Sequence, residues 1–210
     1  MRNIDEINNI RSEKPKDYFA VMELTPEQLK KRLEYTEKAF PIFDLILILI
    51  LTMRDYETID VDYIKTTLID RLTTLFLDFT TPDDYLIDYA INTAENFVDT
   101  TIEHQDDEYY TSEDRALFNA ENSANDVANY VEYQEAIEKG KTHKMWISKA
   151  DVKVRKTHQL VSSKKIPIDK LFEVGKAKMR FPKDYEAGEH PEETVNCRCT
   201  VKYLPEDKEA

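Results

Sequence analysis

The sequence predicts an α+β protein in which a predominantly α-helical N-terminal region precedes a small C-terminal α+β module. Two observations support this prediction. Glycine occurs only at positions 140, 175 and 188, so the first 139 residues lack the residue best suited to left-handed turns, which favours long helices over sheets. After residue 140 the sequence changes to short apolar segments separated by turn-forming residues, which is typical of strands.

The chain of 210 residues is 41% hydrophobic and 34% charged, which is ordinary for a protein with a buried core. We therefore expect one large domain or two small ones. The predicted divisions are a polar arm over 1–24, a helical region over 25–140, an α+β module over 141–205 and an acidic tail over 206–210.

The first predicted helix begins at Thr25, which can cap it, with Pro26 in the first turn and Gln28 placed to complete a capping box. Apolar residues then follow at helical spacing at Leu29, Leu33 and Phe40. Pro41 is predicted to end or kink this helix.

A very apolar run follows from Phe43 to Met53. A membrane-spanning helix needs about 20 apolar residues, and this run is shorter and contains Asp44. We expect a helix that is buried on all sides, or a surface that another subunit covers, and no membrane association.

Three more helices are predicted before residue 140. The first covers Val61 to Phe76, where apolar residues recur at helical spacing. The second begins at Thr81-Pro82-Asp83-Asp84, with Thr81 as the cap and acidic residues in the first turn. The third runs for roughly 27 residues from Ser112-Glu113-Asp114 to Gly140, where glycine can adopt the left-handed conformation that ends a helix.

The C-terminal module is predicted to mix strands with one helix. Segments 143–148, 165–168 and 199–204 have the short bulky or alternating patterns of strands, and 199–204 is bounded by Pro205. Asp151 to Val161 is predicted to form a short helix with Asp151 near its N-terminus.

Charge is distributed unevenly. Residues 1–140 carry 13 Lys/Arg against 31 Asp/Glu, a net of −18, whereas residues 141–180 carry 12 against 3, a net of +9. An acidic body repels nucleic acid at long range, while the basic segment can contact DNA or a partner locally. Alternatively, the basic and acidic parts face each other within the fold. The candidate contact residues are Lys153, Lys156, Lys164, Lys165, Lys176, Lys178 and Arg180.

Two strings of residues in the module carry the most specific signal. The first follows Trp146 and reads D-x-x-V-R-x-x-H, formed by Asp151, Val154, Arg155 and His158. The second lies about forty residues later and reads N-C-R-C, formed by Asn196, Cys197, Arg198 and Cys199. On a helix, Asp151, Arg155 and His158 share one face, where Asp151 and Arg155 can pair. On a strand, Cys197 and Cys199 share one face, with Asn196 and Arg198 on the other.

One interpretation of these residues is a structural zinc site. Zinc favours tetrahedral thiolate and imidazole ligands, and the candidate ligands are His158, His190, Cys197 and Cys199. Against it, the C-x-C spacing is tighter than usual and His190 lies in a loop-like segment.

In the other interpretation, which we favour, no cofactor is expected and both cysteines are small core residues. Arg155 and His158 then hydrogen-bond the turn at Asn196. Two cysteines at this spacing do not form a secreted disulfide framework, and no signal-peptide pattern is present, so we expect a reducing cytoplasm or a particle assembled there.

Catalysis is not expected. A cysteine, a histidine and an acidic residue or asparagine are the components of a thiol protease, but no glycine-rich oxyanion turn or nucleophile elbow surrounds either cysteine. A phosphate-binding loop and a dinucleotide fingerprint are also missing from the sequence.

The two strings, with further short matches in the same order, resemble the C-terminal signature of the phage Mu protein F-like family. Its members are minor head or head-morphogenesis proteins of tailed bacteriophages. The resemblance covers about residues 110–204. The family often has a glycine turn after the histidine, where this chain has Val161-Ser162-Ser163. The further matches are Tyr110-Thr111-Ser112, Arg115-Ala116, Ala120-Glu121-Asn122, Ala124-Asn125, Lys144-Met145-Trp146, Phe172, Gly175, Pro182-x-Asp184 and Glu192-Glu193-Thr194-Val195.

The resemblance implies a non-enzymatic minor head protein that acts in head morphogenesis. It implies a place inside the capsid, in the host cytoplasm during assembly, near the portal. The implied partners are the portal protein, the scaffold or the major capsid protein, with oligomerisation in the particle and contact with phage DNA as further expectations. The alternative function is a zinc-dependent nucleic-acid-binding module.

Overall fold

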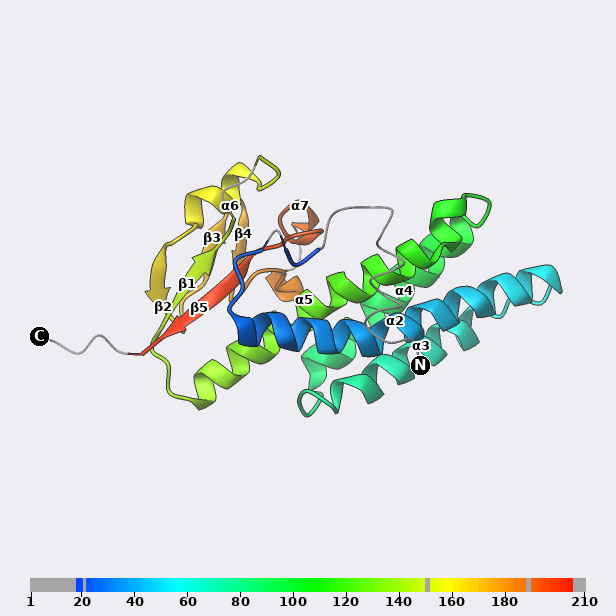
Figure 1. Ribbon diagram of the computed structural model, residues 1–210, viewed down its shortest axis with the longest axis horizontal. Coiled ribbons are helices and arrows are strands. Elements are labelled where there is room, and N and C mark those ends of the chain that lie inside the picture. The colour runs from blue at the N-terminus through cyan, green and yellow to red at the C-terminus, as the bar shows by residue number, and fades with distance from the viewer. Residues whose placement is uncertain (1–17, 21, 150–151, 188–189, 206–210) are drawn as a thin grey trace, which may run out of the picture. The chain divides into compact units, whose positions relative to one another are not determined.

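The computed structural model describes residues 18–20, 22–149, 152–187 and 190–205 (Figure 1). Contacts between residues divide the chain into two compact units. Of the described residues, unit 1 contains Arg32–Ala124 and unit 2 contains the rest. The boundary predicted at residue 140 falls just after the end of the long helix α5 (Glu113–Glu138), whereas these contacts group residues from Asn125 onward with the strands.

The predicted α+β class is confirmed, since helices make up the N-terminal part and the strands of the described residues all follow residue 140. In unit 1, α3 (Val61–Phe76) packs against α4 (Asp84–Glu103). Helix α2 (Pro26–Asp55) and α5 also contribute residues to this unit. The apolar faces bury Phe40, Phe43, Ile46, Ile50, Ile64, Leu68, Leu72, Phe76, Leu86, Phe97 and Val98.

Helix α2 continues through Pro41 to Asp55, so of the two predicted alternatives, an end or a kink at this proline, the end is wrong. Proline removes one helical hydrogen bond, but Phe40 and Phe43 on either side are fully buried, and that burial offsets the loss. The apolar run is not buried on all sides, because Ile48 is 53% exposed. None of the helices within the described ranges is long and apolar enough to cross a membrane.

Short polar side chains fix where the helices begin. Thr25 and Gln28 form the predicted capping box, in which Thr25 N donates to Gln28 Oε1 at 3.1 Å and Gln28 N donates to Thr25 Oγ1 at 3.2 Å. Helix α3 has the predicted bounds, and Asp60 accepts from Tyr63 N at 3.0 Å. The prediction for α4 is wrong by two residues, since Asp83 rather than Thr81 caps it.

The end of α4 is tied to the start of α5 within unit 1 by the buried guanidinium of Arg115. It donates to Thr100 Oγ1 at 2.7 Å, to Tyr110 O at 2.9 Å and to Thr101 Oγ1, and it lies 4.5 Å from the ring centre of Phe97. These hydrogen bonds give the buried guanidinium the partners that a buried charge needs. Burial lowers the pKa of Arg115, while the nearby tyrosines act in the opposite direction.

Unit 2 contains an antiparallel sheet with the strand order β2–β1–β5 (Figure 1). β1 spans His143–Ile147, β2 Lys165–Pro167 and β5 Thr200–Leu204. His143 pairs with Pro167 on one side and with Leu204 on the other. The three strands predicted from sequence are therefore confirmed to within one or two residues.

A second, two-stranded sheet was not predicted. It is a hairpin of β3 (Phe172–Val174) and β4 (Ala177–Met179), joined through Gly175 with φ of +61°. Phe172 and Trp146 pack with ring centres 5.2 Å apart. On α5, Tyr130 and Tyr133 pack against Phe181 at 5.9 and 5.3 Å, which completes the core of unit 2.

The predicted helix from Asp151 to Val161 is shorter than expected. In the structure α6 spans Lys156–Val161 with Arg155 at its N-cap, and Asp151 lies outside the described residues. The turn after α6 places Ser163 at φ of +64°, with its N–H donating to Trp146 O at 2.7 Å. Serine thus adopts the left-handed conformation at the point where the sequence lacks the glycine that the resemblance leads one to expect.

Candidate functional site

The two strings that stand about forty residues apart in the sequence are in contact within unit 2. Arg155, at the start of α6, donates from Nη2 to the carbonyl oxygen of Val195 at 2.6 Å. Val195 directly follows α7 (Pro191–Thr194) and precedes Asn196, whose φ of +55° turns the chain. The N-C-R-C segment is thereby brought beside α6.

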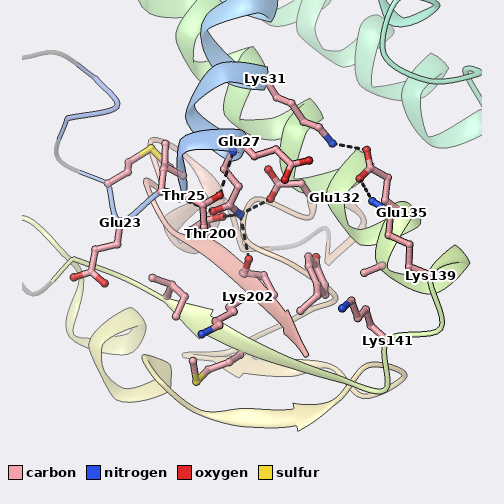
Figure 2. A pocket seen from close by; sticks show the side chains of 18 residues that line it. Glu23, Thr25, Glu27, Lys31, Glu132, Glu135, Lys139, Lys141, Thr200 and Lys202 are labelled. Carbon is pink, nitrogen blue, oxygen red and sulfur yellow. Dashed lines mark hydrogen bonds and ion pairs between the residues drawn. The ribbon is translucent and has the colours of Figure 1, made fainter. Parts of the chain in front are cut away.

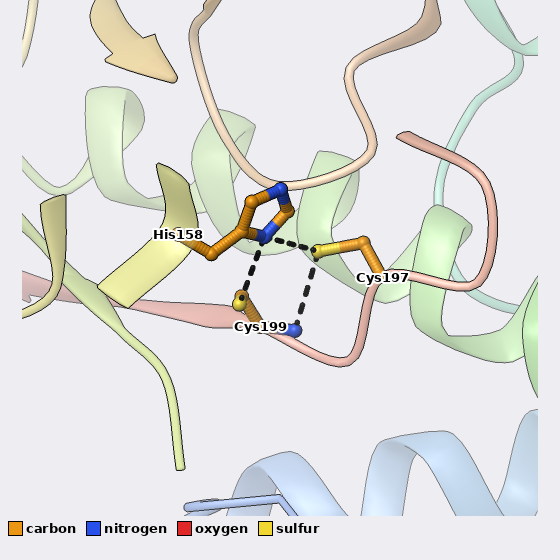
Figure 3. A group of neighbouring side chains, drawn as sticks. All are labelled: His158, Cys197 and Cys199. Atoms are coloured by element: carbon orange, nitrogen blue, oxygen red, sulfur yellow. Dashed lines mark hydrogen bonds between the residues drawn. The ribbon is translucent and has the colours of Figure 1, made fainter. Parts of the chain in front are cut away.

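His158, Cys197 and Cys199 meet in the interior of unit 2 (Figure 3). Nδ1 of His158 lies 3.4 Å from each sulfur, and the three side chains are at most 3% exposed. The backbone N–H of Cys199 also points at the sulfur of Cys197, at 3.5 Å. The prediction that the cysteines share one face of a strand is wrong, because β5 begins only at Thr200. A turn, not a strand, aims both sulfurs at the imidazole.

Glu193 holds the other side of the imidazole ring. Its Oε2 lies 3.1 Å from His158 Nε2 and accepts a hydrogen bond from Thr157 Oγ1 at 2.7 Å. Glu193 is 7% exposed, so this carboxylate is buried with its partners. A proton on Nε2 is directed at the carboxylate, which leaves Nδ1 to face the two sulfurs.

Gly175 makes room for this carboxylate. A β-carbon at position 175 would lie 2.2 Å from Glu193 Oε1 and 3.1 Å from Thr157 Cγ2. The left-handed φ of this residue also favours glycine. The hairpin of β3 and β4 therefore closes over the Glu193–His158 contact only because this position carries no side chain.

Two asparagines on α5 hold the backbone of the cysteine segment. Asn125 Nδ2 donates to the carbonyl of Cys197 at 3.2 Å. One turn later, Asn129 Nδ2 donates to the carbonyls of Pro182 and Cys199 at 3.1 and 3.4 Å. Both asparagines are at most 1% exposed. Sequence reasoning missed this role, although two amides at i and i+4 among buried residues need partners and could have indicated one.

The electrostatics of the group favour opposite charges on His158 and Cys197. Burial works to raise the pKa of Cys197, but hydrogen bonds from Cys199 and His158 and the charge of the imidazole hold it well below its usual value. Burial works to lower the pKa of His158, yet the contacts with Cys197 raise it overall. The hydrogen bond to Cys197, followed by burial, raises the pKa of Cys199. The group is thus suited to a thiolate at Cys197.

The structure also places the other residues that the sequence singled out in this module. Trp146 is fully buried and meets the ring of His158 edge-on, with centres 5.6 Å apart. Val154 and Arg198 line a small cavity of about 20 Å³ beside the cysteines. His190 lies outside the His158–cysteine group, and its Nδ1 is 3.0 Å from Glu192 Oε1.

Most of the predicted basic contact residues are on the surface of unit 2. Lys153, Lys156, Lys164, Lys165, Lys176 and Lys178 are exposed. Arg180 differs, because it is half-buried and pairs with Asp184 at 2.8 Å and with Glu186. Lys178 is paired across the hairpin with Glu173, which reduces the local positive charge.

A second, larger hollow of about 840 Å³ lies in unit 2 beside β5 (Figure 2). Hydrogen bonds cross it, since Gln28 Nε2 donates to Glu132 at 2.8 Å and to Thr200 at 3.2 Å. Glu135 on α5 pairs with Lys31 and, at 2.8 Å, with Lys139. These contacts join the start of α2 to α5 and β5, so the side chains that make them have a structural role in the hollow.

The His158–cysteine group lacks room for a substrate. Cys197, His158 and Glu193 are the residue types of a nucleophile, a base and an orienting acid. All three are buried, however, and the adjoining cavity of about 20 Å³ is the size of one water molecule. The arrangement is therefore suited to holding two segments of chain together, by hydrogen bonds or by a metal ion.

Comparisons with known proteins agree with this signature. The family model described as phage Mu protein F like protein matches residues 86–202, which is more than half of the chain and includes both strings. No curated protein and no solved structure matches the chain. The match extends the similarity into α4, before the region where the sequence motifs begin. The chain therefore belongs to the phage Mu protein F-like family, which links it to bacteriophage head morphogenesis.

Proposed function

We propose that the chain is a minor head protein that binds inside the procapsid near the portal. The observation that carries this proposal is the family match over residues 86–202 together with the two strings that it includes. The buried His158–cysteine group leaves no room for a substrate, which favours a structural role over an enzymatic one. The protein then acts by presenting complementary surfaces to the portal, scaffold or major capsid protein.

The two surfaces that such a role needs differ in charge. Residues 1–140 are acidic, with a net of −18, and are suited to basic protein surfaces. The exposed lysines of residues 153–178 on unit 2 are suited to packaged DNA or to an acidic partner. We assign the lysine surface to DNA contact inside the head.

The test is quantitative mass spectrometry of procapsids and mature particles from the phage that encodes the chain. We expect a few copies per particle, co-purification with the portal protein, and lower infectivity or DNA retention when the gene is deleted. Absence of the chain from procapsids and particles alike would reject the proposal.

DNA contact has its own test. The full chain is compared with a variant in which Lys153, Lys156 and Lys164 are replaced by serine. Each lysine that contacts a phosphate contributes about −0.9 to the slope of log affinity against log salt, so the variant should bind more weakly and with a shallower slope. Equal slopes would remove DNA from the proposed partners. A zinc-dependent nucleic-acid-binding module requires, in addition, that removal of metal abolishes this binding.

A further inference from the structure

The group formed by His158, Cys197 and Cys199 has the dimensions of a metal site. Its three ligand atoms lie within 4.8 Å of one another, and Nδ1 is 3.4 Å from each sulfur. Zinc–sulfur and zinc–nitrogen bonds of about 2.3 and 2.0 Å that meet at a tetrahedral angle place sulfur and nitrogen about 3.5 Å apart. The observed separations match those of ligands that share one zinc ion.

We infer that His158 Nδ1, Cys197 Sγ and Cys199 Sγ bind a structural zinc ion. Thiolate and imidazole are the ligands that zinc prefers in tetrahedral sites. The fourth position faces the small cavity of about 20 Å³ that the three ligands line together with Arg155 and Arg198. A water molecule needs at least about 10–15 Å³, so the cavity has room for one as the fourth ligand.

The surroundings of the group supply the outer contacts that a metal site requires. A histidine that binds metal usually donates its other N–H to a carboxylate or a carbonyl, which fixes the ring. Glu193 occupies this position at 3.1 Å from Nε2, on the side of the ring away from the sulfurs. It cannot also act as a ligand from there, so it is a positioning residue. Thr157 holds the same carboxylate oxygen at 2.7 Å.

The sulfurs also have donors directed at them. The backbone N–H of Cys199 lies 3.5 Å from Cys197 Sγ, a contact that stabilises a thiolate. Beside Cys199 lies the buried indole of Trp146, whose Nε1 acts on that sulfur as a donor and has no other hydrogen-bond partner within the described residues. A metal-bound sulfur carries more negative charge than a thiol, and it is therefore the better neighbour for this N–H.

The ion would join α6 to the segment before β5. The sheets of unit 2 have strands of only three to five residues. A metal ion that binds the folded chain stabilises it, because the binding free energy adds to the free energy of unfolding. This role does not depend on which partner the protein binds in the head.

The test uses the full chain, expressed with zinc in the medium and purified under reduction without a chelator. Elemental analysis should find one zinc ion per chain. Replacement by cobalt should give the visible bands of a tetrahedral ion and the near-ultraviolet absorption of cobalt–thiolate bonds. Cys197→Ser and Cys199→Ser should lose the metal, while the matched control His190→Ala should keep it.

A further variant gives a result that does not depend on whether the two serine variants fold. Glu193→Gln keeps all three ligands and should weaken zinc binding by about 10–100-fold in competition with a chromophoric chelator, as losses of outer-shell partners do. Folded wild-type chain with two free thiols that takes up neither zinc nor cobalt would overturn the inference. A Cys197–Cys199 disulfide in the reduced preparation, or unchanged affinity in Glu193→Gln together with unchanged metal content in both serine variants, would overturn it as well.

Discussion

The two units are stabilised by different kinds of interaction. Unit 1 buries apolar faces that recur at helical spacing, such as Ile64, Leu68 and Leu72 on α3. Unit 2 buries polar groups whose partners come from distant parts of the chain, such as His158 with Glu193 and Lys183 with Asp126 at 2.8 Å. A buried polar group costs free energy unless its particular partner is present. Unit 2 should therefore tolerate fewer exchanges of side-chain type than unit 1.

The largest effect is expected from a cavity in unit 1. Phe43 is fully buried with its ring centre 5.0 Å from that of Phe97, so Phe43→Ala should lower the free energy of unfolding by about 3–5 kcal/mol. Ile48→Ala is the matched control in the same apolar run, and because Ile48 is 53% exposed the loss should be below about 1 kcal/mol. Urea denaturation measures both. Similar losses of free energy of unfolding in the two variants would contradict the conclusion that only one side of this run is buried.

The next effect concerns the pH dependence of unit 2. Lys144 on β1 is fully buried, donates to Arg180 O at 2.7 Å and lies 5.1 Å from the ring centre of Phe172. Burial lowers its pKa to about 8, against the smaller opposing effect of Asp184, while Arg180 lowers it further and Asp169 raises it. Above pH 8 the unfolded chain then binds this proton more tightly than the folded chain. The free energy of unfolding should therefore rise as the pH rises from about 8 to 10. The gain reaches at most about 3 kcal/mol at pH 10.5, the ordinary pKa of a lysine.

The contribution of Lys144 is isolated by comparison with Lys144→Met. Both chains contain the same other titrating groups, including Tyr133, whose pKa is raised chiefly by burial. The difference in free energy of unfolding between the two chains should grow in favour of the wild type as the pH rises from 8 to 10. A difference that is constant over this range would show that Lys144 is not charged and buried as described.

A smaller effect is expected from the amide that supports the cysteine segment. Asn129→Ala removes the donor to the carbonyls of Pro182 and Cys199, and should cost about 1–3 kcal/mol because both acceptors are buried. Asn92→Ala on the exposed face of α4 is the control and should change stability by less than about 0.5 kcal/mol. Thermal unfolding of the two variants makes the comparison. Equal effects would contradict the support role of Asn129.

The smallest effect is expected at a local cap. Thr25→Ala breaks the reciprocal hydrogen bonds with Gln28 and should cost about 0.5–1 kcal/mol, measured by urea denaturation. Thr25→Ser keeps the hydroxyl and should restore most of that loss. A serine variant as unstable as the alanine variant would show that the capping hydrogen bond contributes little.

Local sequence patterns were enough to predict most of the helices before residue 140. The bounds of α3 follow from apolar periodicity, and Gly140 takes φ of +65° just past the end of α5 as predicted. The continuation of α2 through Pro41 was not predictable from local rules, because it depends on burial of Phe40 and Phe43 in the tertiary structure. The cap of α4 was misplaced because Thr81 and Asp83 both have capping side chains.

Only some of the residues that form the site in unit 2 could be predicted from the sequence. Residue types and spacing identified His158, Cys197 and Cys199, and the structure brings them together. Glu193 and Asn129 were missed because a buried acid or amide is recognised by its partner, and those partners lie 35 and 70 residues away. The hairpin of β3 and β4 was missed because strands of three residues carry almost no periodic signal.

Hydrogen exchange across residues 193–201 tests most directly whether α6 and the cysteine segment hold each other in place. In a full chain with His158→Asn, the amides of this segment should exchange much faster than in the wild type, because Glu193 and both cysteines lose their shared partner. In His190→Asn they should be unchanged, since the His190 side chain lies 3.0 Å from Glu192 and the asparagine keeps the carbonyl that accepts from Glu193 N. Wild-type protection of residues 193–201 in the His158→Asn chain would contradict the account.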